Sequence, residues 1–134
     1  MITEPRATIQ DLYHVPDKGK AEIVDGELVL MSPTGIKPGR AGGKVFASLL
    51  RHEEENGGGY AIPDNVGFVV HLPGRDSFSP DAGWHVGDPE SMKFAEGAPR
   101  FAVEVRSEND CGPAAEQAIS RKIADYFEAG AWVV

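Results

Sequence analysis

The chain has 134 residues, a length typical of one domain with a modest hydrophobic core. Its 13 Lys and Arg residues against 21 Asp and Glu residues give a net charge of −8, which disfavours non-specific binding to nucleic acid or to anionic membranes. A single cysteine, Cys111, excludes an internal disulfide and a thiolate zinc cluster, and no apolar run is long enough to span a bilayer, so we expect a cytoplasmic protein with no membrane partner.

The first elements predicted along the chain are a short helix and a β-hairpin. Thr8 can cap a helix that continues to Tyr13. Apolar residues alternate over residues 20–24 and again over residues 27–31, with Asp25-Gly26 between them. Both central residues of a two-residue hairpin turn need positive φ, which aspartate and glycine tolerate, so the sequence predicts a tight hairpin.

A long helix and several short strands are predicted next. The helix covers residues 39–55, and its apolar stripe is formed by Val45, Phe46, Leu49 and Leu50. Strand-like segments follow at residues 60–63, 66–72, 79–86 and 100–106. Between them we expect a turn at residues 73–76 and a loop over residues 87–99, because both contain proline and glycine.

The C-terminal region is predicted to form a helix and the beginning of another strand. Pro113 suits the first turn of a helix that extends to Ala129, and Gly130 stands where glycine commonly ends a helix. The apolar residues 132–134 then begin a strand at which the chain stops. We therefore expect a single domain over residues 1–134 that is shortened at its C-terminal end, with a sheet edge that is either missing or completed by a partner chain, as in a homodimer.

Two carboxylates, Asp81 and Glu104, are the main candidates for chemistry. Each lies on the less apolar face of a predicted strand, since strand side chains alternate between faces. Burying an unpaired carboxylate is costly, and a cation between the two removes that cost. Two acids brought together in this way suit a hard divalent cation such as Mg²⁺. The alternative is structural: Asp81 caps a turn after Pro80, and Glu104 pairs with Arg106 or another cation.

Lys122 is the third candidate. On a helical wheel of the last predicted helix, it falls at the edge of the apolar stripe formed by Ala115, Ile119, Ile123, Tyr126 and Phe127. A lysine at this boundary can extend its ammonium group to solvent, which is the simpler interpretation. It can also reach over a sheet toward Glu104, where the ammonium group could position a water molecule and stabilise charge on a phosphate.

Several short motifs resemble those of one protein family. They are residues 22–35 (EIVDGELVLMSPTG), Ser79-Pro80-Asp81, residues 103–107 (VEVRS), and Arg121-Lys122 with Tyr126 and Gly130. Together they cover nearly the whole chain and resemble the Uma family of bacterial restriction-endonuclease-like proteins, a branch of the PD-(D/E)XK nuclease superfamily. The resemblance implies an α/β fold with a restriction-endonuclease-like core, in which helices flank a central mixed β-sheet.

The resemblance also implies roles for particular residues. Asp81 and Glu104 match the family's ligands for Mg²⁺, with Mn²⁺ as an alternative ion, and Glu22 matches an early acid often counted with them; the other interpretation of Glu22 is an exposed strand residue. The superfamily motif has its lysine two residues after the second acid, where this chain has Arg106. The family takes the lysine from the following helix, and Lys122 matches it. The implied activity is metal-dependent hydrolysis of phosphodiester bonds, with DNA as the substrate, in which Lys122 orients the attacking water or takes its proton.

Basic residues are candidates for contacts with the nucleic-acid backbone. Lys37, Arg40 and Lys44 cluster at the start of the first long helix, where the alternative is a solvated helix end, and Arg106 is grouped with them. The family often has a histidine in this segment, whereas this chain has Lys37-Pro38-Gly39-Arg40. A competing function is a catalytically weak or inactive nuclease-like module for binding or assembly, which the net charge of −8 and Arg106 in the motif position also fit. A weaker alternative is a hydrolase of another phosphate ester.

Overall fold

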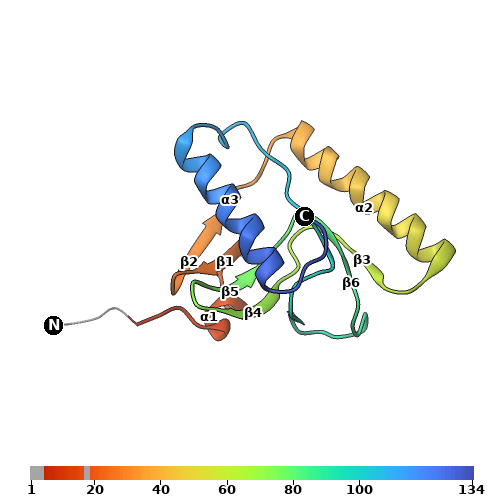
Figure 1. Cartoon of the computed structure of the whole chain (residues 1–134), viewed down its shortest axis with the longest axis horizontal. Coiled ribbons are helices and arrows are strands. Elements are labelled where there is room, and N and C mark those ends of the chain that lie inside the picture. The colour runs from red at the N-terminus through yellow and green to blue at the C-terminus, as the bar shows by residue number, and fades with distance from the viewer. Residues whose placement is uncertain (1–4, 17–18) are drawn as a thin grey trace.

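The computed structural model describes residues 5–16 and 19–134 of the chain. In chain order its elements are α1 (Ile9–Tyr13), β1 (Lys20–Val24), β2 (Glu27–Met31), α2 (Ile36–Asn56), β3 (Tyr60–Ile62), β4 (Phe68–Leu72), β5 (Arg75–Phe78), β6 (Ala82–His85), β7 (Ala95–Glu96), β8 (Phe101–Val103) and α3 (Pro113–Glu128). In Figure 1 the two long helices, α2 and α3, lie above most of the strands. Within these residues, no helix combines the length and the apolar character needed to cross a bilayer.

The local predictions for the N-terminal elements are confirmed. Thr8 caps α1 through a reciprocal pair of hydrogen bonds with Asp11. β1 and β2 pair in antiparallel register over their full length. Asp25 and Gly26 have φ values of 52° and 76°, the positive values that the tight turn between these strands requires.

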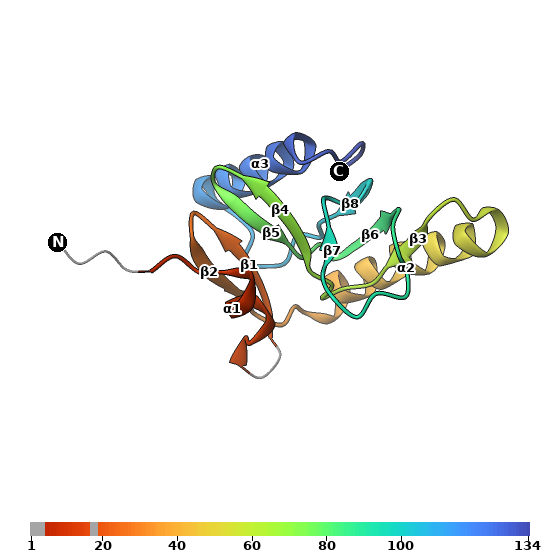
Figure 2. The ribbon, with the colours of Figure 1, turned by 90° about the horizontal axis from the view of Figure 1, so that it is seen from below.

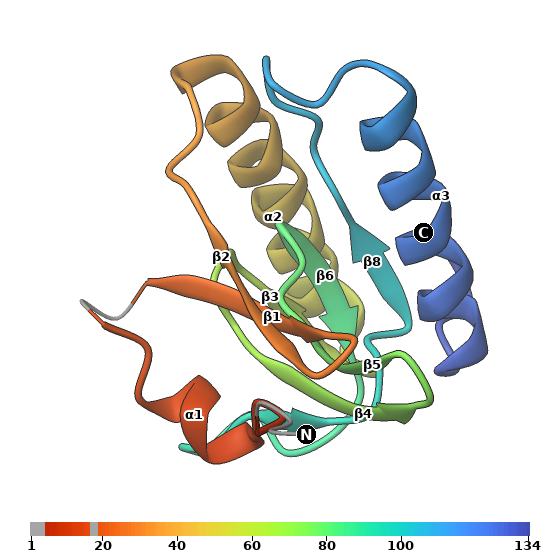
Figure 3. The ribbon, with the colours of Figure 1, turned by 90° about the vertical axis from the view of Figure 1, so that its left-hand side faces the viewer.

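The strands form two sheets, whereas the sequence predicts one central sheet. A mixed five-stranded sheet has the order β2-β1-β5-β4-β7, in which β4 and β7 are the parallel pair. A three-stranded antiparallel sheet has the order β3-β6-β8. Figures 2 and 3 show β6 and β8 between α2 and α3. The mixed α/β class with flanking helices is confirmed, and the single sheet is corrected to two.

The chain passes from one sheet to the other through Ser79-Pro80-Asp81. The predicted strand over residues 79–86 is wrong at its start, because β6 begins at Ala82. Pro80 is fully buried and has no N–H group to donate to a strand ladder, so β5 cannot continue into β6. Asp81 therefore lies at the junction of the two sheets.

β5 begins at Arg75, inside the segment for which the sequence predicts a turn. The predicted turn over residues 73–76 is confined to Pro73-Gly74, and Arg75 pairs with Leu72 across it. Charged residues are typical of exposed turns, but Arg75 is only 5% exposed and lies in ion pairs. Because Arg75 interrupts the apolar pattern of β5, a prediction from hydrophobic pattern alone does not find this strand.

The C-terminal strands are shorter than predicted. The expected loop over residues 87–99 contains the two-residue strand β7. β8 ends at Val103, so the predicted strand over residues 100–106 is too long and Glu104 lies just beyond it. Residues 132–134 contribute one parallel bridge, Phe101↔Val133, in place of a full strand.

The two long helices occur where the sequence predicts them. α2 begins at Ile36, three residues earlier than expected, because Pro38 in the first turn needs no N–H partner. Its half-buried side chains follow the predicted stripe of Val45, Phe46, Leu49 and Leu50. α3 begins with Pro113, and Gly130 follows its end with a φ of 110°, as predicted.

The buried face of α3 differs from the predicted stripe. Tyr126 is fully buried and stacks on Phe78 of β5, with 3.9 Å between the ring centroids. Ile123 and Phe127, which were predicted to be core, are 37% and 49% exposed. The inward-facing line is instead Ala115, Ile119, Lys122 and Tyr126. Lys122 therefore lies on the inward face of the helix.

His85 on β6 is a buried histidine whose Nδ1 has no hydrogen-bond partner in the described part of the chain. Its ring makes T-shaped contacts with Tyr60 and Phe68. Burial lowers the pKa of His85 below its ordinary value of 6.5, and the charge of Arg100 lowers it further. The folded protein therefore resists protonation of His85 more strongly than the unfolded chain does.

We expect the free energy of unfolding to fall as the pH drops below 6.5, because the unfolded chain then binds a proton that the folded state excludes. His85→Phe should reduce this fall, which urea denaturation at about pH 7.5 and about pH 5.5 measures. His71 on β4 is exposed, so His71→Phe is the matched control and should keep the wild-type dependence. An unaltered pH dependence in His85→Phe would contradict this assignment.

Candidate active site

Asp81 and Glu104 lie at matching ends of two paired strands. β6 and β8 are antiparallel, and Ala82 is the register partner of Val103. Asp81 precedes β6 and Glu104 follows β8, so the same register makes them cross-strand neighbours, whose side chains share one face. The N–H of Asp81 donates to the carbonyl of Val103 at 2.9 Å, which extends the ladder to Asp81. The fold thus places the two predicted acids side by side.

Asp81 is held by two donors. Its Oδ2 accepts a hydrogen bond from the N–H of Val105 at 2.6 Å, and its Oδ1 accepts one from Nζ of Lys20 at 2.9 Å. Lys20 also donates to Oδ1 of Asp64 at 2.6 Å. Asp81 is therefore oriented by the backbone that follows β8 and neutralised by a lysine from β1.

Glu104 is held by two side chains of α3. Its Oε1 accepts a hydrogen bond from the hydroxyl of Tyr126 at 2.6 Å and lies 2.9 Å from Nζ of Lys122 in an ion pair. Burial raises the pKa of Glu104 above its ordinary value of 4.5, and the charge of Lys122 acts against that rise. Among the residues that the structure describes, Oε2 of Glu104 has no hydrogen-bond partner, so this oxygen is available to a ligand.

Lys122 bridges Glu104 and Glu22. Its Nζ lies 3.0 Å from Oε2 of Glu22 and 2.9 Å from Oε1 of Glu104, and its side chain is 17% exposed. The ammonium group therefore does not extend into bulk solvent, as the simpler interpretation of the sequence has it. It stands between two carboxylates that come from β1 and from the end of β8.

Glu22 is 3% exposed, so it is not the exposed strand residue of the alternative interpretation. Its Oε2 also accepts the N–H of Ser79 at 2.6 Å, and its Oε1 accepts a hydrogen bond from Arg75 at 3.1 Å. Arg75 continues the network to Asp125, with 3.0 Å between Nε and Oδ2. Both oxygens of Glu22 are engaged by protein donors, one of them beside Nζ of Lys122, and a role of Glu22 in holding a metal ion stays a prediction.

Lys20, Tyr126 and Arg75 are among the members of the candidate site that the sequence analysis did not predict. Lys20 stands two residues before Glu22, so the alternation of strand side chains could have placed both on one face. Tyr126 stands four residues after Lys122, so helical spacing could have placed both on one side of α3. No local signal marks Arg75, whose partners are 53 and 50 residues away in the sequence.

The ion pairs of the site form two separate groups, each with an excess of one negative charge. Lys20 lies 2.6 Å from Asp64 and 2.9 Å from Asp81. Arg75 and Lys122 join Glu22, Glu104 and Asp125 through contacts of 2.9–3.1 Å. Over residues 5–16 and 19–134, no three His, Cys, Asp or Glu side chains form a metal site by themselves, so an ion here needs backbone and water oxygens as well, which Mg²⁺ accepts.

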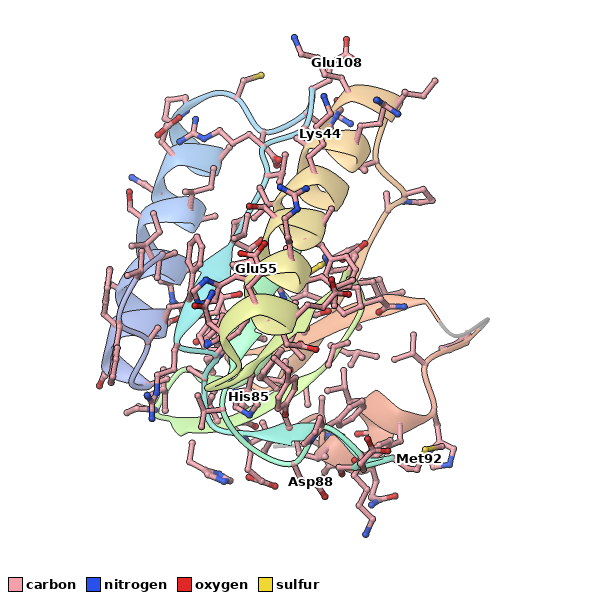
Figure 4. The ribbon with its side chains drawn as sticks, turned by 90° about the vertical axis from the view of Figure 1, so that its right-hand side faces the viewer. Lys44, Glu55, His85, Asp88, Met92 and Glu108 are labelled. Atoms are coloured by element: carbon pink, nitrogen blue, oxygen red, sulfur yellow. The ribbon has the colours of Figure 1, made fainter. Side chains whose placement is uncertain are left out.

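The predicted nucleic-acid contacts on α2 lie outside this cluster. Lys37, Arg40 and Lys44 are exposed and fall within an arc of about 60° on the helix surface. That arc faces away from Gly42, the buried residue of α2 that packs against Asp81. Figure 4 shows Lys44 at the end of the molecule that carries Glu108. Contact of these residues with nucleic acid stays a prediction.

Arg106 forms an ion pair with α3. Its guanidinium nitrogens lie 2.5 and 3.0 Å from the two carboxylate oxygens of Glu116, and the two side chains are 52% and 56% exposed. The structural alternative predicted that Glu104 pairs with Arg106 or with another cation; the pair with Arg106 does not occur, and Glu104 pairs with Lys122. A role for Arg106 in binding nucleic acid stays a prediction.

Comparisons with known proteins agree with this architecture. The family model Uma2, described as "Putative restriction endonuclease", matches residues 7–134. The crystal structure of a "putative nuclease belonging to DUF820" from Anabaena variabilis matches with a TM-score of 0.71 and 14% sequence identity, over 93% of this chain and 70% of that chain. At this identity the structural match concerns the fold alone. None of the curated protein sequences matches the chain.

Proposed function

Because the chain belongs to the Uma2 family of restriction-endonuclease-like proteins, we propose that it is a metal-dependent nuclease that hydrolyses phosphodiester bonds in DNA. The observation that carries this proposal is the position of Lys122, whose Nζ lies 2.9 Å from Glu104 and 3.0 Å from Glu22. An ammonium group held beside the second acid can orient a water molecule and stabilise the charge that develops on a phosphate.

The carboxylates of Asp81 and Glu104, with the carbonyl oxygen of Val105 as the family resemblance implies, are the groups that would hold Mg²⁺ or Mn²⁺. Oxygen ligands suit these hard cations, and the two groups of ion pairs that contain Asp81 and Glu104 each carry an excess of one negative charge. When bound, the ion polarises the scissile phosphate and lowers the pKa of a coordinated water.

The residues of the chain supply position and charge for the reaction. Glu22 fixes the ammonium group of Lys122 from β1, and Tyr126 occupies the same oxygen of Glu104 as Lys122, so the second oxygen of Glu104 remains for the ion. Lys122 then donates to the attacking water or to a non-bridging phosphate oxygen. Arg106 stands in the position of the superfamily lysine, but a guanidinium stays protonated and therefore does not act as a general base.

This function predicts DNA cleavage that depends on a divalent ion. Gel electrophoresis of plasmid, linear duplex and single-stranded DNA should show cleavage with Mg²⁺ or Mn²⁺ and none with EDTA. Asp81→Asn keeps an oxygen that accepts the N–H of Val105 but removes the charge, so cleavage should fall at least ~100-fold. Asp88→Asn, in an exposed loop, is the matched control and should cleave like the wild type.

Two results would overturn this function. One is the absence of cleavage with every ion and substrate, and the other is equal cleavage by Asp81→Asn. A protein that binds DNA but does not cut it with any ion would instead support the competing function, a nuclease-like binding module.

A further inference from the structure

Lys20 is a cation of the candidate site to which the proposed function gives no role. Lys20 is the first residue of β1, and its side chain is 15% exposed. Its Nζ lies 2.6 Å from Oδ1 of Asp64 and 2.9 Å from Oδ1 of Asp81.

The ammonium group occupies the oxygen of Asp81 that a metal ion needs. Oδ2 of Asp81 is already bound to the N–H of Val105 at 2.6 Å, and Lys20 takes Oδ1. A divalent ion bound to Oδ1 at about 2 Å stands next to the ammonium group, and two positive charges at that separation repel each other strongly where solvent is limited. Lys20 and a metal ion therefore compete for one oxygen atom.

Asp64 gives Lys20 a second partner. It lies in the turn between β3 and β4, and its side chain is 61% exposed, so it stands outside the buried part of the network. The ammonium group is closer to Asp64 than to Asp81. A rotation within the flexible lysine side chain can therefore separate it from Asp81 without leaving it unpaired.

We propose that Lys20 is a built-in counter-ion of Asp81 that a divalent cation displaces onto Asp64. In the metal-free protein Lys20 neutralises Asp81 and keeps its carboxylate in place. Metal binding is then an exchange of one cation for another at Oδ1, and Lys20 sets the affinity of the site for the ion. This inference rests on the metal site of the proposed function, and it makes Lys20 a positioning residue rather than a catalytic one.

Titration of the full chain with Mn²⁺ in the absence of DNA tests this exchange. Calorimetry should give a Kd at least about fivefold lower for Lys20→Met than for the wild type, because the competing charge is gone. Lys20→Arg keeps a cation on Asp81 and should restore the weaker, wild-type affinity. Lys93→Met, at an exposed lysine in the loop before β7, is the control and should leave the Kd unchanged.

Asp64→Asn should have the opposite effect. Without Asp64 the ammonium group has only Asp81 as a partner, so Mn²⁺ should bind at least about fivefold more weakly. Asp64→Asn should not weaken Mn²⁺ binding in the Lys20→Met background, because the ammonium group that donates to Asp64 is absent there. Asp64 lies in an exposed turn, so this variant keeps the inference testable if Lys20→Met does not fold.

The outcomes separate this inference from the nuclease function. An unchanged or higher Kd in folded Lys20→Met, or an Asp64→Asn effect that persists without Lys20, overturns the inference even if the wild type cleaves DNA. Binding of Mn²⁺ by Lys20→Met but not by the wild type supports the inference. Absence of binding in both proteins overturns the inference, whereas the DNA-cleavage assay alone decides the nuclease function. Circular dichroism establishes that each variant is folded.

Discussion

Lys122→Met is expected to reduce DNA cleavage at least ~100-fold, because it removes the ammonium group that stands between Glu22 and Glu104. Methionine keeps an unbranched apolar side chain, so the packing of α3 changes little while the charge disappears. Initial rates of cleavage at saturating Mg²⁺ or Mn²⁺ measure the effect, and Mn²⁺ titration shows whether the variant still binds the ion.

Lys122→Arg separates the charge of this side chain from its shape. Arginine keeps a cation beside Glu22 and Glu104 but carries a planar group that stays protonated. Lys122→Arg should therefore be more stable than Lys122→Met but recover only a small part of the wild-type cleavage activity. Lys93→Met removes an exposed lysine and should cleave like the wild type. A cleavage rate of Lys122→Met within about threefold of the wild-type rate would exclude Lys122 from the reaction.

Arg75→Met is expected to lower the free energy of unfolding by about 3–5 kcal/mol, the cost of removing one partner from a buried ion pair. Arg75 is 5% exposed and lies 3.1 Å from Glu22 and 3.0 Å from Asp125, with its guanidinium 4.6 Å from the ring centroid of Phe78. Its removal leaves Glu22 with one cation fewer at a position that excludes water. Small domains have a total stability of about 5–15 kcal/mol, so this loss is a large fraction of it.

Arg121→Met is the matched control for Arg75→Met. Arg121 lies 2.7 Å from Asp25, but the two side chains are 45% and 60% exposed, so solvent screens the pair and the expected loss is much smaller than that of Arg75→Met. Urea denaturation followed by circular dichroism gives both values. Arg75→Met/Glu22→Gln should regain part of the lost stability, because it removes the buried carboxylate charge that has lost one of its two cations. Equal losses for the two arginines would contradict a stabilising role of the buried network.

Elements specified by local backbone chemistry are predictable from the sequence. The turn at Asp25-Gly26, the cap at Thr8 and the end of α3 at Gly130 each depend on conformations or hydrogen bonds that few residue types provide. The formation of β5, by contrast, is not determined by the sequence around it. Arg75 can lie in a buried strand only because carboxylates 53 and 50 residues away neutralise it, and no pattern around Arg75 contains that information.

The candidate site is also predictable only in part, because some of its contacts join residues that are far apart in the sequence. Motif order and spacing identify Asp81 and Lys122, and the fold places both in ion pairs of the candidate site. They do not identify Lys20, whose partners are 61 and 44 residues away. The helical wheel puts Lys122 at the edge of the apolar stripe because it treats Ile123 and Phe127 as buried, whereas the fold exposes both and turns the lysine inward.

The passage of the chain through Ser79-Pro80-Asp81 makes the candidate site depend on both sheets at once. Asp81 is hydrogen-bonded to the three-stranded sheet through Val103, whereas Lys20 and Glu22 belong to the five-stranded sheet. The candidate metal ligands and the groups that balance their charge thus come from different parts of the fold. The ion pair between Asp81 and Lys20 therefore exists only while the two sheets are docked, so any local opening between the sheets takes the site apart.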